Sequence, residues 1–243
     1  MGAPRLSVCV VAQNHASFLG RLFANVDEVA WEIVLIDGGS KDGTDELAAA
    51  NPKVRHFRVP WQGSVTRQKN IAMDRARGEW ILILDCDELL GPDLRAALPG
   101  LMRNPLVRYY KFPRYNLVQV RPHRHVVAKH TYPNFQFRML RRSTRLRYDE
   151  RLPVHNLFED PRRPGRRFKG VRKKLFMRKP RDLHIFHYDF YLNDRAARER
   201  KVARYESLQP GGGLESDYLW EDQEHRIVDT PPPWPEEDHR RPE

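Results

Sequence analysis

The sequence predicts an α/β fold in which a mostly parallel sheet is flanked by helices. Short apolar, valine-rich segments alternate along the first hundred residues with segments whose apolar residues recur at helical spacing. Strands that alternate with helices in this way form parallel sheets. Such sheets bind ligands beyond the carboxyl ends of their strands, so a binding site is expected at that edge.

The elements follow one another as strand, loop and helix. The predicted strands are 6–12, 32–36, 54–59, 80–84, 107–112, 135–140 and 183–188, and the predicted helices are 16–26, 44–50, 65–77, 93–103 and 194–207. Turn formers separate the early units, as in the run from Asp37 to Thr44. Asn193 or Asp194 is expected to cap the last helix.

The strand Trp80–Leu84 ends in three carboxylates, at Asp85, Asp87 and Glu88. Burying like charges so close together costs several kcal/mol unless a positive charge lies between them. Oxygen ligands suit a hard cation such as Mg²⁺ or Mn²⁺, which typically also binds substrate phosphates. The alternative is an ordinary acidic turn before a helix start.

The predicted helix 65–77 places Arg67 and Asn70 on one face. We expect this face to point toward the same edge as the aspartates. An arginine there could bind a nucleotide phosphate or base through its forked donors. A solvated helix arginine is the alternative.

The two cysteines, Cys9 and Cys86, fall at predicted strands, so no disulfide framework or zinc cluster is expected. No apolar segment approaches the ~20 residues of a membrane span, and no secretory signal is recognisable. We therefore expect a soluble cytoplasmic protein, with peripheral contact at the inner membrane face left open.

Positive charge is concentrated in the middle of the chain. The net charge is +11, and residues 103–181 hold 24 Lys and Arg against 4 Asp and Glu. The densest stretch, residues 162–181, reads RRPGRRFKGVRKKLFMRKPR. Such a surface attracts phosphate-bearing partners, whether nucleic acid, anionic lipid or nucleotide.

Four segments together resemble the family-two glycosyltransferases with the GT-A, Rossmann-like fold. In chain order they read VCVVAQN, IVLIDGGSKDGT, RQKNIA and WILILDCDE. The resemblance covers about the first hundred residues and indicates a bacterial or phage-like member. It implies a nucleotide-sugar-binding half in residues 1–104 and a strongly basic acceptor-binding half in residues 105–208. Residues 209–243 are expected to form an acidic, proline-rich flexible tail, with folding back onto the basic half as the alternative.

The resemblance also implies roles for individual residues. The nucleotide-binding residues would be Ala12, Asn14, Asp37, Gly39, Arg67, Asn70, Asp85 and Cys86, and the metal ligands would be Asp85, Asp87 and His187. The cofactor would be Mn²⁺ or Mg²⁺, and the donor a nucleoside-diphosphate sugar, with UDP favoured. Gly38 stands where many members have a second acidic residue, which leaves the identity of the donor's nucleobase open.

The acceptor half offers two candidate general bases, Asp149 and Glu150. An inverting transfer needs a carboxylate to take the proton of the attacking hydroxyl. The alternative is that both pair with surrounding arginines. Some family members show Val-His-Glu just beyond, where this chain has Val154, His155 and Asn156. His155 is an alternative to His187 at the metal, and a buried, satisfied histidine is the alternative for both.

The basic, histidine-containing segment 114–129 is expected to be a loop over the donor and acceptor groove rather than a metal site. The function implied is an inverting, metal-dependent glycosyltransferase with an anionic acceptor, which could be a glycolipid, polysaccharide, protein or DNA. The alternatives are a nucleic-acid-binding protein that uses the basic half, and a glycosyltransferase that modifies DNA.

Overall fold

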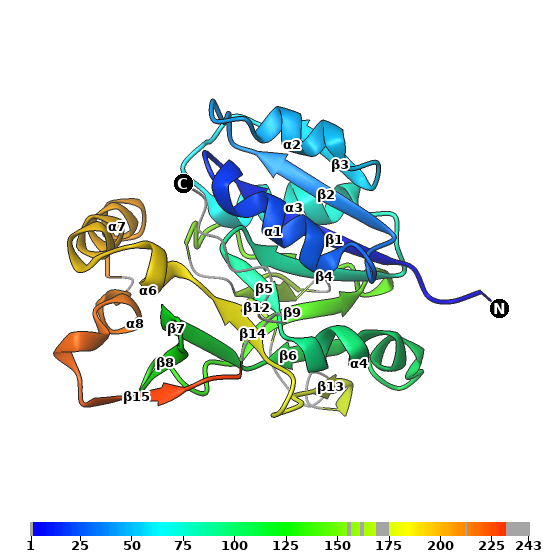
Figure 1. The fold of residues 1–243 in the computed structure, drawn as a ribbon. Helices are drawn as coiled ribbons and strands as arrows, with labels where there is room; N and C mark the ends of the chain where they lie inside the picture. Colours follow the sequence, from blue (N-terminus) through cyan, green and yellow to red (C-terminus); the bar gives the residue numbers. More distant parts are fainter. Residues whose placement is uncertain (1, 155–156, 161–162, 169–174, 212, 232–243) are drawn as a thin grey trace.

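The computed structural model describes residues 2–154, 157–160, 163–168, 175–211 and 213–231 (Figure 1). A seven-stranded sheet has the strand order β13-β6-β9-β4-β1-β2-β3. Its strands are β1 (Leu6–Ala12), β2 (Glu32–Asp37), β3 (Val54–Arg58), β4 (Trp80–Asp85), β6 (Tyr109–Phe112), β9 (Gln136–Arg141) and β13 (Met177–Arg178). The β4-β1-β2-β3 part is parallel, and β9 runs antiparallel to β4 and β6. The predicted mostly parallel sheet is confirmed.

Helices cover both faces of this sheet, as predicted. One core contains residues of α1 (Ala16–Val26), α2 (Thr44–Ala50) and α4 (Pro92–Arg103), and the other contains residues of α3 (Val65–Arg75). Alternate side chains of β1 enter the two cores: Val8 and Val10 lie in the first and Cys9 in the second. A strand buried on both faces needs the continuous apolar run seen in the sequence.

The strand register brings the acidic residues to one edge. Ala12 at the end of β1 pairs with Asp37 of β2, and Val11 pairs with Asp85 of β4. Segments distant in sequence therefore meet beyond the carboxyl end of β1, where the parallel topology predicts a binding site.

The second half of the chain forms two smaller sheets. A five-stranded sheet, in the order β15-β8-β7-β14-β5, contains β5 (Glu88–Leu90), β7 (Arg114–Val120), β8 (His123–Ala128), β14 (Ile185–His187) and β15 (His225–Asp229). A three-stranded sheet contains β10 (Arg147–Tyr148), β11 (Phe158–Asp160) and β12 (Arg163–Arg167).

The prediction of a loop over residues 114–129 is wrong, because this segment is the β7–β8 hairpin. Arg121 and Pro122 lie between the paired strands. In β8, His123 and His125 are buried while Arg124 is exposed. This alternation is the strand pattern, which the local excess of basic residues obscured.

The remaining helical segments are η1 (Arg142–Thr144), α6 (Asp189–Leu192), α7 (Arg195–Leu208), α8 (Glu215–Tyr218) and η2 (Trp220–Asp222). The Asp194 side chain caps α7 by accepting from the Ala197 backbone N–H, as predicted.

The expected flexible tail folds back in part. β15 pairs antiparallel with β8, Arg124 forms an ion pair with Asp229 at 3.0 Å, and His125 hydrogen-bonds to Thr230 at 2.7 Å. For these residues the flexible-tail prediction is wrong, because an edge strand of the basic half gives the acidic segment a partner. Residues 232–243, and residues 162 and 169–174 of the basic stretch, lie outside the described residues.

Candidate active site at the carboxyl edge of the sheet

The loops after β1 and β2 are joined by hydrogen bonds at the carboxyl edge. The Gly38 N–H donates to the Ala12 carbonyl at 2.8 Å. The Asn14 N–H donates to the Ser40 hydroxyl at 2.8 Å, and the Asn14 side-chain oxygen accepts from the Lys41 N–H at 2.9 Å. The sequence-predicted residues Ala12, Asn14, Asp37 and Gly39 therefore come together.

Asp37 is buried and organises its own loop. One carboxylate oxygen accepts from the Gly39 N–H at 3.0 Å, the Ser40 N–H at 2.8 Å and the Ser40 hydroxyl at 2.6 Å. The other lies 3.4 Å from His56 Nε2. Burial alone would raise the pKa of Asp37, but these hydrogen bonds outweigh it and lower the pKa.

Gly38, which stands where the resemblance leads one to expect a second acidic residue, lies against the Gln13 side chain. A Cβ on Gly38 would lie 3.2 Å from Gln13 Cβ, and the Gln13 amide donates to the Gly38 carbonyl at 3.2 Å. The Gln13 side chain therefore occupies the space beside Gly38.

A potential cation site formed by Asp37, Asp45 and His56 is the one such group of three found among the described residues. Arg58 lies there already: it forms an ion pair with Asp45, and its Nε is 4.0 Å from Asp37. This side chain supplies the positive charge that a metal would otherwise bring.

Helix α3 presents a lysine to the acidic strand end. Lys69 is buried, and its Nζ lies 2.5 Å from one oxygen of Asp85. Arg67 is exposed, and no ion pair joins its side chain to Asp37, Asp85 or Asp87 in the described part of the chain. The predicted face with Arg67 and Asn70 is therefore not the part of α3 that binds Asp85, because buried Lys69 makes that contact.

Asn70 binds a different element. Its amide nitrogen donates to the Tyr148 carbonyl at 3.0 Å and to Glu150 at 2.8 Å, and its oxygen accepts from the Tyr148 N–H at 2.8 Å. Asn70 therefore attaches α3 to β10. The sequence-based expectation that its side chain points toward the aspartates is not met, because its polar atoms bind Tyr148 and Glu150.

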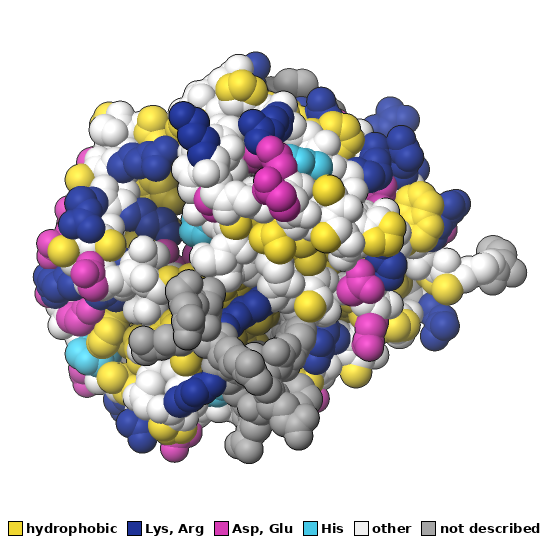
Figure 2. Space-filling model, turned by 45° about the horizontal axis from the view of Figure 1, so that its top comes forward, with side chains coloured by type: hydrophobic (Ala, Val, Ile, Leu, Met, Phe, Trp, Pro, Cys, Tyr) yellow, Lys and Arg dark blue, Asp and Glu magenta, His cyan; other side chains and the backbone are white. Residues whose placement is uncertain are grey.

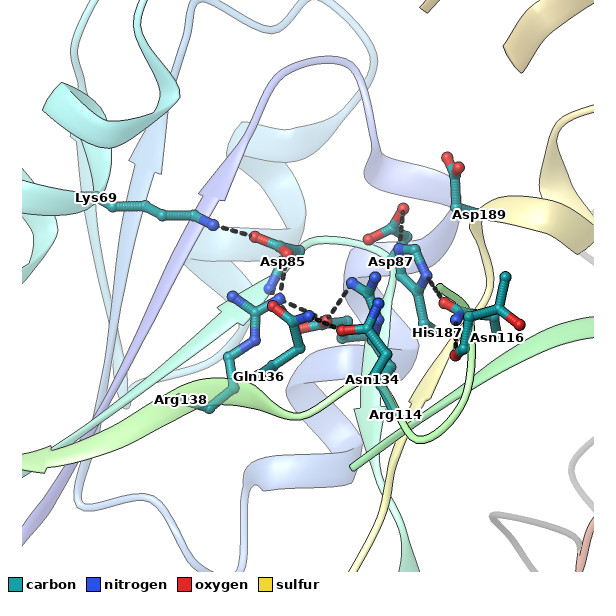
Figure 3. Close-up of polar contacts among 12 residues, drawn as sticks. Lys69, Asp85, Asp87, Arg114, Asn116, Asn134, Gln136, Arg138, His187 and Asp189 are labelled. Atoms are coloured by element: carbon teal, nitrogen blue, oxygen red, sulfur yellow. Dashed lines mark hydrogen bonds and ion pairs between the residues drawn. The ribbon is translucent and has the colours of Figure 1, made fainter. Parts of the chain in front are cut away.

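Asp85 is fully engaged by buried cations (Figure 3). Lys69 binds one carboxylate oxygen, and Arg138 of β9 binds the other. Arg138 also binds Glu88 at 2.6 Å, and Glu88 accepts from the Asp85 backbone N–H at 3.0 Å. Burial alone would raise the pKa of Asp85, but the charges of Arg138 and Lys69 hold it well below its usual value.

Lys69 and Arg138 were missed at the sequence level. Lys69 stands two residues from the arginine chosen, and Arg138 is the one charged residue within the strand run FQFRML. A basic residue on the buried side of a strand next to a row of carboxylates is the signal that could have identified Arg138.

Asp87 has a different partner, His187 of β14. His187 Nε2 lies 3.5 Å from one oxygen of Asp87. Asn116 donates its amide nitrogen to the Thr131 carbonyl at 2.8 Å, so its oxygen is left to accept from His187 Nδ1 at 2.8 Å. Because Nδ1 is held by Asn116, Nε2 is the ring nitrogen that His187 turns toward Asp87.

A carboxylate oxygen and an imidazole nitrogen that face each other need a proton or a cation between them. Both groups are common metal ligands, and a histidine whose other nitrogen is held by an amide is the usual supported form. Burial alone would raise the pKa of Asp87, but the neighbouring His187 and Lys201 lower it well below its usual value. Asp87 and His187 therefore fit a divalent cation, whereas both oxygens of Asp85 already bind cationic side chains.

Cys86 lies between the two aspartates. Burial raises the pKa of its thiol well above the usual value, and the charges of Asp87 and Asp85 add to this effect. The thiol is therefore protonated at neutral pH, and the structure brings Cys86 to the site without giving the thiol the character of a metal ligand.

The two candidate bases lie beside β10. Asp149 is buried, and Arg151 donates to both of its oxygens at 2.7 and 2.6 Å. The Glu150 side chain is 45% exposed and accepts from Asn70. Both line a small pocket between α3 and β10. His155 and Asn156 lie outside the described residues.

Comparison with known sequences gives a family assignment. The family model described as "Glycosyl transferase family 2" matches residues 7–178. The lipopolysaccharide core biosynthesis glycosyltransferase LpsC of Rhizobium meliloti is 34% identical over 101 residues, which cover 40% of this chain and 37% of that protein. The succinoglycan biosynthesis protein ExoO of the same organism is 32% identical over 95 residues, covering 37% and 27%. The matches thus span less than half of the curated relatives.

Comparison with solved structures shows the same fold. The mannosyltransferase PcManGT from Pyrobaculum calidifontis, in complex with GDP-Man and Mn²⁺, has a TM-score of 0.56 at 15% identity, covering 96% of this chain and 67% of that one. S. aureus TarS 1–349 in complex with UDP-GlcNAc has a TM-score of 0.54 at 14% identity, covering 87% and 75%.

Proposed function

Because this chain belongs to glycosyl transferase family 2, we propose that it transfers a sugar from a nucleoside-diphosphate sugar to an acceptor hydroxyl, with inversion at the anomeric carbon. Its fold is the GT-A fold predicted from the sequence. The observation that carries the proposal is the pair Asp87 and His187, oriented by Asn116 at the carboxyl edge beside the β1 and β2 loops.

Asp87 and His187 are the residues that would hold the divalent cation. When bound, such a cation neutralises charge on the diphosphate leaving group as the glycosidic bond breaks. Asp85, Lys69 and Arg138 would instead fix the strand end, so that Asp87 emerges in a defined position. This division of roles revises the expectation that Asp85 is itself a ligand.

The nucleoside would lie against the loops after β1 and β2. Asn14, Asp37 and Gly39 line this edge, and Gln13 takes the space beside Gly38. Arg67 is exposed at the first turn of α3 and free to meet a phosphate. We favour UDP as the nucleotide of the donor, and GDP is the nucleotide to test against it.

Of the two candidate bases, we favour Glu150. The Asp149 carboxylate is buried, and Arg151 donates to both of its oxygens, so Arg151 already occupies the positions that an acceptor hydroxyl would need. The Glu150 side chain is the more accessible of the two. The base would take the acceptor proton as the acceptor oxygen attacks the anomeric carbon and the diphosphate departs.

A bacterial surface glycan is the acceptor class we propose. The names of LpsC and ExoO, which concern lipopolysaccharide core and succinoglycan biosynthesis, support this choice. None of the helices in the described ranges has the length and apolarity needed to cross a membrane.

The nucleic-acid-binding alternative gains little from the visible surface. On the face shown in Figure 2, Lys and Arg side chains are interspersed with Asp and Glu and do not form one continuous patch among the described residues. Direct DNA binding would be recognised by a steep salt dependence.

A thermal-shift panel tests the proposal directly. UDP and GDP should each be tested with and without Mn²⁺, and a nucleotide that binds the folded chain should raise its Tm. We expect a metal-dependent shift with at least one of the two. The absence of any shift, together with salt-sensitive DNA binding, would contradict the glycosyltransferase proposal.

A further inference from the structure

Helix α7 lies across the carboxyl edge of the sheet, on the side toward which the β2 arrow points in Figure 1. It follows α6, which begins two residues after His187. At its other end, a methyl group of Leu208 lies 3.5 Å from where a Cβ on Gly63 would be. The Arg204 guanidinium lies 5.3 Å from the ring centroid of Trp61, and the Trp61 backbone N–H donates to the Gly38 carbonyl. Helix α7 therefore extends from the segment that follows His187 to the loop after β2, where we propose that the nucleoside binds.

One face of α7 makes these contacts. Lys201, Arg204, Tyr205 and Leu208 are spaced three or four residues apart and so lie along the same side of the helix. Arg200, which precedes Lys201 in the chain, is exposed. The face directed at the site therefore carries a cation midway between its two ends, at Lys201.

Lys201 is held beside the metal-binding pair by Asp189. Its Nζ lies 2.6 Å from Asp189 Oδ1, and Asp189 is fully buried. Tyr218 stacks over the ammonium at 5.0 Å. Burial opposes the charged form, but Tyr218, Asp189, Tyr205 and Asp87 outweigh it and raise the pKa of Lys201 well above its usual value. The ammonium is charged at neutral pH.

The hydrogen-bonding capacity of this cation is not used up. An ammonium has three N–H donors, and in the described residues the bond to Asp189 is the one that Lys201 makes. Its side chain is 27% exposed, so Lys201 is not sealed inside the protein. Asp189 Oδ2 is likewise buried without a hydrogen-bond partner among the described side chains. Unused charged donors next to Asp87 suit a group rich in anionic oxygens.

We propose that Lys201 binds the diphosphate of the nucleotide-sugar donor, and that Asp189 is the positioning residue for its ammonium. The inference rests on the proposed function. As the bond between the anomeric carbon and the diphosphate oxygen breaks, its electron pair stays on that oxygen. Lys201 keeps its proton and stabilises the developing charge through a charge-assisted hydrogen bond.

The test compares nucleoside diphosphates with monophosphates. UDP, UMP, GDP and GMP are titrated into the full chain with Mn²⁺ by calorimetry. In Lys201→Gln we expect the affinity for the diphosphate to fall about tenfold, the order expected for losing a hydrogen bond to a charged group, while the monophosphate affinity is unchanged. Lys201→Arg should restore part of the preference, and Arg200→Gln, at an exposed position of α7, should match the wild type.

A second variant controls for destabilisation, because Lys201→Gln alone leaves the buried Asp189 carboxylate without its cation. The double variant Lys201→Gln with Asp189→Asn removes both charges and should show the same loss of diphosphate preference. Equal losses for diphosphate and monophosphate, or an unchanged preference in both variants, would overturn the assignment of Lys201. A wild-type chain that binds no nucleotide would instead overturn the proposed function.

Discussion

Asp85 and Asp87 stand two residues apart at one strand end, yet their surroundings differ in kind. Asp85 has a cationic side chain on each oxygen, from Lys69 and Arg138. Asp87 faces one imidazole, 3.5 Å away. The first carboxylate is neutralised within the protein by two cationic side chains, whereas His187 is the side chain paired with the second in the described residues. Under the proposed function, the two members of this Asp-x-Asp pattern have separate roles: Asp85 supports the strand end and Asp87 binds the cation.

The comparison predicts the largest effect on stability at Asp85. Asp85→Asn would leave Lys69 and Arg138 buried with one counter-charge fewer, and removing one member of a buried pair costs about 3 kcal/mol. We expect urea denaturation to show a loss of that size in the free energy of unfolding. An unchanged midpoint would mean that the Asp85 cluster is not a structural ion network.

The same change at Asp87 should affect chemistry more than folding. Asp87→Asn is expected to lower sugar transfer, or donor hydrolysis, by about a hundredfold, because losing a metal ligand removes a few kcal/mol of transition-state stabilisation. Its urea midpoint should stay near that of the wild type. If Asp87→Asn and Asp85→Asn lose stability equally, the contrast between the two carboxylates fails.

Asn116 offers a smaller and more specific change. Asn116→Ala removes the group that fixes the His187 tautomer, and loss of such an outer partner typically costs about tenfold in metal affinity. Mn²⁺ titration in the presence of UDP measures this loss. Affinity equal to that of the wild type would show that His187 does not depend on Asn116.

The weakest expected effect is a difference in acid sensitivity. The pKa of Asp85 lies well below its ordinary value of 3.8, so the unfolded chain takes up this proton at higher pH than the folded one. The stabilisation is therefore complete above pH 3.8 and is lost as the pH falls below it. Urea midpoints measured at a series of acidic pH values should fall less steeply in Asp85→Asn than in the wild type.

The sequence was most informative where structure depends on local pattern. The run Trp80–Leu84, apolar at every position, predicts a strand buried on both faces, so its acidic end was expected at the same edge as the β1 and β2 loops. The partners of Asp85 could not be derived in this way. Lys69 and Arg138 lie 16 residues before it and 53 residues after it, and their contact depends on how α3 and β9 pack.

The second half was less predictable for the same reason. The hairpin at residues 114–128 was hidden by its basic residues, and β15 is a strand because β8 provides an edge for it. His187 was a candidate from the sequence. Its relation to Asn116, which fixes the ring, depends on the parallel pairing of β14 with β7.

Electron paramagnetic resonance of Mn²⁺ titrated into the chain with UDP would show which of the two aspartates is the metal ligand. We expect saturable Mn²⁺ binding in the wild type, its loss in Asp87→Asn, and its retention in Asp85→Asn under conditions where that variant is folded. If Asp87→Asn bound Mn²⁺ as tightly as the wild type, Asp87 would not be a metal ligand.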